Sequence, residues 1–242
     1  MEPQAKKMRP KKLTVDDIKS GCITLYGENN EETQLCMIQE ELRQGIDMIQ
    51  SYNKSVTFYG SARFPEDHPE YKRARSIAYR IAKELDYTVL SGGGPGIMEA
   101  ANRGAFEAGG RSVGLTITLP HEQNTNKYVT DVIPFYFFFA RKISMSYTTE
   151  VCLFFAGGFG TFDEFFEMLT LKQTGKIGDV PLILVGTEFW NPMQKVIDDM
   201  LLDKFKTVSK EDMNLYIITD DEEKILDIIK NSKMRNGKDA FQ

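Results

Sequence analysis

The chain has few histidines, few cysteines and no long apolar run, and each shortage excludes a class of protein. Its 242 residues include two histidines and three cysteines, with no CxxC pair and no spacing typical of a metal site. We therefore expect no metal, and a reducing cytoplasm fits this cysteine usage, with Cys152 in a buried strand. The longest aromatic run, at 134–140, is far shorter than the roughly 20 residues of a membrane helix. The N-terminus also lacks the apolar core of a signal peptide.

Basic residues are also fewer than acidic ones. A formal net charge of -5 disfavours a general nucleic-acid-binding surface, because such a surface needs a dense cationic face. Hydrophobic residues make up 41% of the chain, enough for a substantial core. We expect an N-terminal tail and extension over 1–30, a helix within 31–54, one main domain over 55–232 and a polar tail over 233–242.

Strand-like and helical segments alternate along the main domain. Nearly continuous apolar stretches, among them SVTFYGSA, SVGLTI, VCLFFAG and VPLILVG, indicate a parallel sheet covered on both faces. The fold class predicted is α/β, a Rossmann-like doubly wound parallel sheet with an added N-terminal helix. In that helix, over 31–52, apolar residues recur every three or four positions at Leu35, Ile38, Leu42, Ile46 and Ile49. This apolar face is expected to cover the main domain or to contact a partner subunit.

The loops that follow the strands are the candidate ligand sites, because ligands of such sheets bind beyond the carboxyl ends of the strands. In the first loop, YGSARF at 59–64, a hydroxyl from Ser61 and a guanidinium from Arg63 could hold a phosphate. An ordinary turn is the alternative interpretation.

The second loop, SGGGPGIMEAANRGA at 91–105, has enough glycine for its backbone N–H groups to close around an anion. Gly93, Gly94 and Gly96 are the residues we expect to do so. The loop does not match GxGxxG, because Ile97 stands at the last glycine position, and no lysine follows as in a P-loop. An NAD-dependent oxidoreductase and a P-loop ATPase are therefore both disfavoured.

The third loop, AGGFGTFDE at 156–164, again places amides and a hydroxyl at the start of a helix. The residues in question are Gly157, Gly158, Gly160 and Thr161. Thr161 and Glu164 also spell T-x-x-E, which is typical of a capping box, so Glu164 taken alone could simply cap the helix.

A chemical role for Glu164 follows if both glycine loops hold one sugar phosphate. A carboxylate beside the ribose would stabilise the oxocarbenium-like charge that develops as an N-glycosidic bond breaks, and it would activate water. Arg141, directly after an aromatic run, could be held against a base and a phosphate. The alternative is that Arg141 and Lys142 form a solvated basic pair.

The motifs SGGGPGIMEAAN, ARK and GGFGTFDE, in this order over most of 55–230, resemble those of the LONELY GUY family. This family comprises the cytokinin riboside 5'-monophosphate phosphoribohydrolases, and the form of the second loop is similar to its longer bacterial branch. Ala156 stands where the family signature PGGxGTxxE has proline. Relatives have carried the label lysine decarboxylase, but the sequence shows no lysine setting distinctive of pyridoxal phosphate.

The resemblance implies hydrolysis of AMP or an N6-substituted AMP to free base and ribose 5-phosphate, with no cofactor and with Arg141 and Glu164 as the catalytic pair. It implies a homo-oligomer, dimer or hexamer, in which the aromatic segment 135–139 lines either the base pocket or an interface. A non-catalytic nucleotide-binding or sensing module of the same fold stays open as the alternative. The substrate-binding residues predicted are Ser61, Gly93, Gly94, Gly96, Glu99, Lys142, Gly157, Gly158, Gly160 and Thr161.

Overall fold

The computed structural model describes residues 13–28, 30–52, 54–118 and 124–233. In these ranges a seven-stranded sheet has the order β4-β3-β2-β1-β5-β6-β7, and every neighbouring pair of strands is parallel. The strands are β1 (Ser55–Tyr59), β2 (Thr88–Ser91), β3 (Ser112–Ile117), β4 (Asp131–Phe135), β5 (Val151–Phe154), β6 (Leu182–Leu184) and β7 (Ile217–Ile218). The predicted Rossmann-like α/β class is confirmed.

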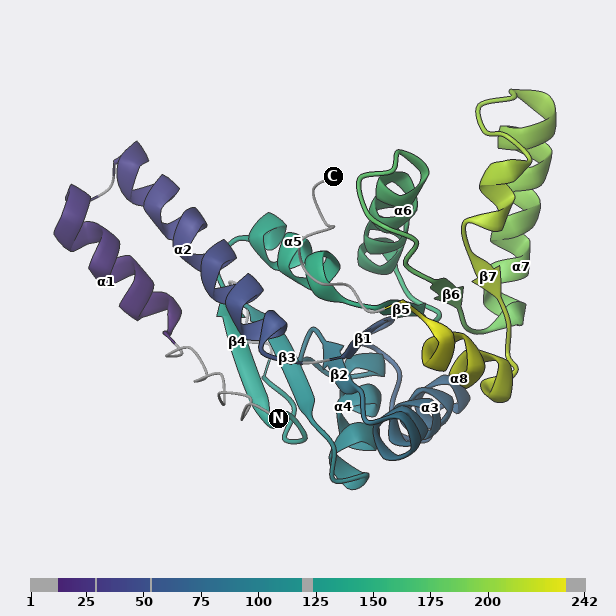
Figure 1. Cartoon of the computed structure of the whole chain (residues 1–242), viewed down its shortest axis with the longest axis horizontal. Helices are drawn as coiled ribbons and strands as arrows, with labels where there is room; N and C mark the ends of the chain where they lie inside the picture. The colour runs from purple at the N-terminus through teal and green to yellow at the C-terminus, as the bar shows by residue number, and fades with distance from the viewer. Residues whose placement is uncertain (1–12, 29, 53, 119–123, 234–242) are drawn as a thin grey trace, which may run out of the picture.

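Helices cover both faces of this sheet (Figure 1). The helices are α1 (Val15–Tyr26), α2 (Glu31–Gln50), α3 (Pro69–Leu85), α4 (Ile97–Glu107), α5 (Phe138–Thr148), α6 (Phe159–Gln173), α7 (Thr187–Val196) and α8 (Glu222–Asn231). Of these, α1 packs mainly on α2 and belongs to neither of the two core clusters at the sheet. A π-helical segment, Ile197–Lys204, continues α7, and a short 3-10 helix, Glu211–Asn214, precedes β7. One core cluster joins α3, α4 and α8 to the sheet, and a second joins α2, α5, α6 and α7 to its other face.

The order of the strands sets the place of a ligand site. β1 is central, with β2 on one side and β5 on the other, so the direction in which the chain winds reverses there. The loops that leave the carboxyl ends of two strands on opposite sides of such a switch point diverge and leave a crevice. The three loops singled out in the sequence follow β1, β2 and β5.

The helix α2 forms as predicted, and only part of its apolar face covers the main domain. Ile49 is buried and Leu42 packs against the core, whereas Leu35 is 65% exposed. Glu41 is fully buried, and its carboxylate accepts hydrogen bonds from the backbone N–H groups of Tyr136 (2.9 Å) and Phe137 (3.1 Å), just before α5. These hydrogen bonds allow a carboxylate to be buried beside the apolar residues of the helix.

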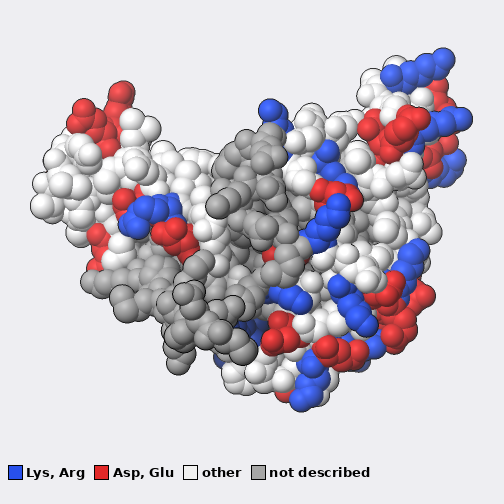
Figure 2. Space-filling model, in the orientation of Figure 1, with Lys and Arg blue, Asp and Glu red and all other residues white. Residues whose placement is uncertain are grey.

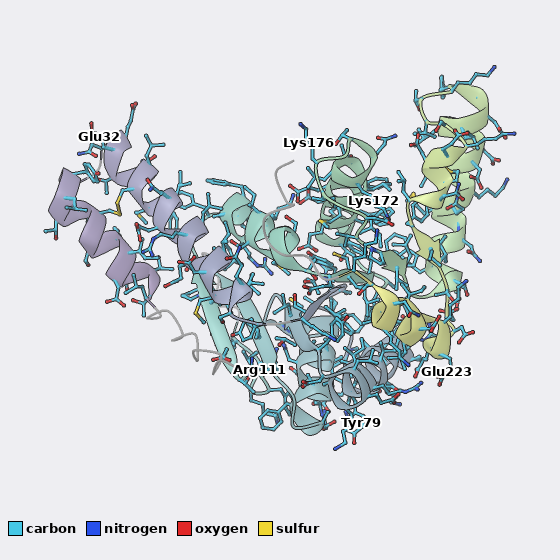
Figure 3. The ribbon with its side chains drawn as sticks, viewed as in Figure 1. Glu32, Tyr79, Arg111, Lys172, Lys176 and Glu223 are labelled. Atoms are coloured by element: carbon cyan, nitrogen blue, oxygen red, sulfur yellow. A yellow bond between two sulfur atoms is a disulfide. The ribbon has the colours of Figure 1, made fainter. Side chains whose placement is uncertain are left out.

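The helix α1 was not predicted, and it forms an arm with α2 at the side of the sheet (Figure 1). Glu32, near the start of α2, lies at the outer end of this arm (Figure 3). A disulfide between Cys22 and Cys36 joins the two helices, whereas Cys152 is free and buried. The expectation of reduced cysteines is wrong for this pair, because residues 14 apart in sequence meet only once two helices pack side by side.

Two surface properties bear on function. Within the described ranges, we find no helix with the length and apolarity needed to cross a membrane. On the face shown in Figure 2, lysines and arginines alternate with acids over α3, α7 and α8 instead of forming a continuous basic surface. Arg80, for example, pairs with Glu84 and Glu223.

Candidate functional site

A cavity of about 810 Å³ lies at the switch point, where the loops after β1, β2 and β5 meet. Its wall includes Arg63, Gly92, Met98 and Ile117, together with several phenylalanines. The structure also brings together here a majority of the residues singled out in the sequence, namely Ser61, Arg141, Gly157, Gly158, Gly160, Thr161 and Glu164.

Ser61 ties the three loops to one another. Its backbone N–H donates to the carbonyl of Ala156 (3.0 Å), and its carbonyl accepts from the N–H of Ile97 (2.9 Å). Gly96 has a φ of +70°, and a Cβ there would lie 2.2 Å from the Ser61 carbonyl oxygen. Only glycine fits this close approach. Gly96 therefore helps to hold two of the loops together at the edge of the cavity, although it is not one of the lining residues.

Other residues of the second loop lie behind the cavity wall. The carbonyls of Gly93 and Gly94 both accept from the side-chain amide of Asn126, each at 3.0 Å. Glu99 accepts a hydrogen bond from the hydroxyl of Tyr71 (3.0 Å), which points its carboxylate toward α3. No motif in the sequence singles out Asn126, although it fixes the shape of the loop.

Gly92, the first glycine of that loop, makes room for Arg141. A Cβ on Gly92 would lie 2.2 Å from Nη2 of Arg141 and 2.6 Å from the sulfur of Met98. Nε of Arg141 donates to the carbonyl of Leu115 (2.7 Å), so one hydrogen bond orients the guanidinium. Burial lowers the pKa of Arg141, and the carboxylate of Glu164 opposes that shift.

The helix α6 begins without a side-chain cap. Its N-cap residue is Gly158, and the helix starts at Phe159, two residues earlier than the sequence predicted. Thr161 therefore lies in the first turn and Glu164 in the second, so the predicted capping box does not form. A Cβ on Gly157 would lie 2.2 Å from Oγ1 of Thr161, which shows how closely the loop folds over that hydroxyl. The first-turn N–H groups of α6 point at the cavity, where they suit an anion.

Glu164 has the most perturbed carboxyl group of this site. Burial raises its pKa to about 7, while the positive charges of Arg141 and Lys142 oppose the shift and the acids Asp163 and Glu167 add to it. A carboxyl group with a pKa near 7 exchanges protons readily at neutral pH, as a general acid or base must.

Lys142 lies beside Glu164 but outside the main cavity. Its ammonium pairs with Asp163 (2.8 Å) and Glu167 (3.1 Å) of α6. The structure thus places the predicted substrate-binding lysine between two acids, from where its charge acts on Glu164.

The residues of the aromatic segment 135–139 lie in different surroundings. Phe135 is buried in the core, whereas Phe138 is 56% exposed and lines the cavity. Tyr136 and Phe139 are also exposed. The cavity rim carries Phe159, 96% exposed. Flat apolar walls of this kind suit the stacking of a base.

The groups that face the cavity suit an organic anion better than a metal ion. In the ranges that the structure describes, no group of three or more His, Cys, Asp or Glu side chains is placed to hold a metal. Backbone N–H groups, Arg141 and Glu164 instead combine anion-binding donors with one poised carboxyl group. This combination fits a sugar phosphate whose reacting carbon lies near the carboxyl group.

Comparison with known proteins gives one family match and several similar proteins. A family model described as "Possible lysine decarboxylase" matches residues 98–229. The chain is similar to a probable cytokinin riboside 5'-monophosphate phosphoribohydrolase, LOGL6, of Oryza sativa subsp. japonica, at 22% identity over 73% of this chain and 71% of that protein. It is also 25% identical to the cytokinin riboside 5'-monophosphate phosphoribohydrolase LOG5 of Arabidopsis thaliana, over 66% of this chain and 71% of that protein.

Solved structures share the fold. The molybdenum cofactor binding protein of Rippkaea orientalis superposes with a TM-score of 0.53 at 23% identity, over 73% of this chain and 93% of that one. The molybdenum cofactor carrier protein of Chlamydomonas reinhardtii gives a TM-score of 0.53 at 23% identity, over 74% and 96%. At this identity the likeness concerns the fold alone.

Proposed function

The chain belongs to the LOG-type family whose model is described as "Possible lysine decarboxylase", and from that premise we propose that it is a nucleoside 5'-monophosphate phosphoribohydrolase. The reaction is hydrolysis of the N-glycosidic bond of a purine nucleoside 5'-monophosphate to free base and ribose 5-phosphate. The substrate class is AMP or an N6-substituted AMP, in line with the names of the curated relatives.

The 5'-phosphate binds at the start of α6. The amides of Phe159, Gly160 and Thr161 belong to its first turn and donate no hydrogen bond to an N-cap side chain, so they are available to phosphate oxygens. Arg63, on the cavity wall, adds a cation. Binding energy from this remote group positions the anomeric carbon for the reaction.

Glu164 acts on the ribose and on water. In its ionised form the carboxylate stabilises the positive charge that develops on the sugar and accepts a proton from the attacking water. Arg141, held by the Leu115 carbonyl, orients the substrate and balances the negative charge of the phosphate. The phenylalanine walls hold the base.

One observation carries this proposal. An acid with a pKa raised to about 7 faces a large cavity, next to a buried arginine and an uncapped helix start. A purely structural carboxylate is instead expected to accept hydrogen bonds from the fold, as Glu41 does from the N–H groups of Tyr136 and Phe137.

The lysine decarboxylase description does not fit the site. Pyridoxal phosphate needs a lysine that can form a Schiff base with it. Within the described ranges the residues that line the cavity include no lysine, and Lys142 is paired with two acids outside it. We derive no step through that cofactor.

We extend the proposal to assembly and location. Leu35, Tyr136, Phe139 and Ile143 are exposed apolar residues on α2 and at or near α5, and the packing of α2 on α5 supports a shared surface for a homo-oligomer. Light scattering of the purified chain would give the number of subunits, a dimer or a hexamer on this proposal.

A cytoplasmic location is part of the proposal, and the Cys22–Cys36 disulfide argues against it. Thiol labelling in intact cells decides the point.

The test measures base release by chromatography. The pure protein is incubated with AMP, N6-isopentenyl-AMP, other nucleoside monophosphates and the matching nucleosides. We expect free base from purine monophosphates alone. Tight binding without release in every case would instead establish the non-catalytic nucleotide-binding module.

The matched variant is Glu164→Gln, with Asp203→Asn on the exposed π-helical segment after α7 as the control. Loss of the ionisable group should lower kcat by about 10³-fold and leave nucleotide binding within a few-fold. Asp203 is exposed and lies outside the cavity lining, so its variant should stay within about threefold of the wild type. Equal loss of binding and turnover in Glu164→Gln would mean that the side chain is structural.

A further inference from the structure

Glu164 lines a second, much smaller cavity on the side away from the proposed substrate. This cavity has a volume of about 10 Å³, close to the space that one buried water molecule occupies. Several polar side chains surround it, and a buried water needs about two to four polar partners. Its lining consists of Tyr59, Lys142, Met145, Ser146, Glu164, Glu167 and Met168.

Tyr59 is one of the polar residues around this small cavity, and its ring is held by stacking. It ends β1, is 4% exposed, and stacks on Phe154 with ring centroids 4.7 Å apart and planes 9° from parallel. Burial raises the pKa of its hydroxyl well above the ordinary value, and the nearby charge of Glu164 adds to that shift. The hydroxyl therefore keeps its proton at any working pH and can donate it in a hydrogen bond.

The charged groups that face Glu164 come from two elements, and the neutral Ser146 of α5 lines the same small cavity. From α5, Arg141 and Lys142 favour its ionised form, and from α6 Asp163 and Glu167 disfavour it. Lys142 is already held by both acids. Tyr59 differs from all four because it is neutral, fixed by stacking, and belongs to a strand of the sheet.

We propose that Tyr59 is a positioning residue for Glu164, acting through one water molecule in the small cavity. The hydroxyl of Tyr59 donates to the water, and the water donates to the Glu164 carboxylate. The inference rests on the proposed function, because it explains how the carboxylate is held toward the sugar. Without this bridge the carboxylate rotates more freely, and its ionised form loses a donor.

The test is Tyr59→Phe, which keeps the stacked ring and removes only the hydroxyl. We expect kcat at pH 7 to fall roughly 5- to 10-fold with KM within twofold, because positioning changes the reacting geometry and not the binding of the nucleotide. The midpoint of the kcat–pH profile should rise by about 0.5 to 1 unit, because a donor to the charged form is lost.

The matched control is Tyr87→Phe. Tyr87 is also buried, and its hydroxyl donates to the carbonyl of Ile229 (3.0 Å), away from the cavity. Its variant should leave both kcat and the pH midpoint unchanged. An unchanged kcat and midpoint in Tyr59→Phe, or equal changes in the two variants, would overturn the inference.

A second measurement does not depend on turnover. The Glu164 carboxyl is titrated by ¹³C NMR in the wild type and in Tyr59→Phe, and the resonance is assigned by its absence in Glu164→Gln. A higher midpoint in Tyr59→Phe supports the bridge, and an unchanged midpoint refutes it. Failure of the proposed function would appear separately, as full turnover in Glu164→Gln.

Discussion

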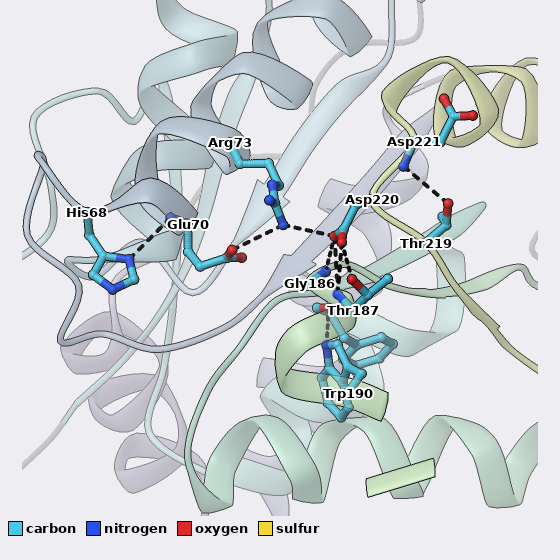
Figure 4. Close-up of polar contacts among 10 residues, drawn as sticks. His68, Glu70, Arg73, Gly186, Thr187, Trp190, Thr219, Asp220 and Asp221 are labelled. Atoms are coloured by element: carbon cyan, nitrogen blue, oxygen red, sulfur yellow. Dashed lines mark hydrogen bonds and ion pairs between the residues drawn. The ribbon is translucent and has the colours of Figure 1, made fainter. Parts of the chain in front are cut away.

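The helices α6 and α7 begin in the same way but use their N-termini differently. Each follows a strand of the sheet and has a glycine as its N-cap residue, Gly158 for α6 and Gly186 for α7. At α7 the carboxylate of Asp220 accepts from the N–H of Gly186 (2.8 Å) and from the N–H and hydroxyl of Thr187 (Figure 4). At α6 no N-cap side chain accepts a hydrogen bond from the first-turn N–H groups.

The two acids near these helix starts have opposite pKa shifts. Burial alone would raise the pKa of Asp220, but the hydrogen bonds from Thr187 and Gly186 and the charge of Arg73 bring it below the ordinary value. Arg73 lies 2.9 Å from Asp220 and 3.1 Å from Glu70 (Figure 4). For Glu164 burial dominates. A carboxylate that the fold satisfies stabilises the fold, whereas one left unsatisfied is available for chemistry.

The largest expected effect comes from giving α6 the cap that α7 has. In Gly158→Asp the new carboxylate would compete with the substrate phosphate for the first-turn amides and repel it, raising KM about 100-fold or more. The fold has room, because a Cβ on Gly158 has no neighbour within 4 Å. The free energy of unfolding should rise by only about a few tenths of a kcal/mol, because glycine is itself a fair N-cap residue. Steady-state kinetics and urea unfolding measure both.

The control for that variant is Gly158→Ala, which adds a Cβ without an acceptor. It should change KM by less than about threefold. If Gly158→Asp binds the monophosphate as tightly as the wild type, the phosphate does not lie at the start of α6.

A second prediction concerns the free energy of unfolding that the fold loses when Glu164 ionises. Its pKa is about 7 in the fold against a model value of 4.5, so the wild type keeps its full stability below pH 4.5 and loses some of it as the pH rises through 7. Glutamine does not titrate. Glu164→Gln should therefore gain about 2 kcal/mol relative to the wild type between pH 5 and pH 8.5, as measured by urea unfolding. A constant difference across that range would contradict the raised pKa.

The third prediction concerns Asp220, the acid that accepts hydrogen bonds at the start of α7. Asp220→Ala removes the acceptor for the start of α7 and should cost about 2 kcal/mol of stability at pH 7, or roughly 4–8 °C in Tm, without changing kcat/KM. Because the pKa of Asp220 is lowered, its contribution is present above its unfolded value of 3.8 and is lost as the pH falls through the folded one. The stability gap between wild type and variant should close in acid.

Asp221→Ala is the matched comparison for Asp220→Ala. Asp221 caps α8 by accepting from the N–H groups of Glu223 and Lys224 and has no arginine partner at salt-bridge distance in the described ranges. Its loss should cost about 1 kcal/mol. A larger cost for Asp221 than for Asp220 would mean that the Asp220 contacts do not stabilise α7.

Much of the site could be predicted because its signals are local. The glycine loops after β1, β2 and β5 are short stretches in which residue type alone determines how a backbone can approach an anion. Arg141 and Glu164 were predicted as a pair, and the structure brings both to one cavity. Their catalytic roles stay predictions until the kinetic test.

The residues that were missed depend on partners far away in sequence. Asn126 shapes a loop 33 residues away, and Glu41 satisfies backbone groups 95 residues away. Gly92 has to be glycine because Arg141, which lies on another element, occupies the space that a Cβ there would need. Nothing in the neighbourhood of these residues along the chain distinguishes them from ordinary polar or glycine positions.

The class of the fold, the alternation of strands and helices, and the loops that could hold a phosphate all follow from local sequence patterns. Apolar patterning and glycine content act on near neighbours, and they need no knowledge of the rest of the chain. The burial of Glu41 in α2, the capping of each helix start and the raised pKa of Glu164 depend instead on how the elements pack. Whether a polar group can be buried, and in which protonation state, is set by the groups that the whole fold brings around it.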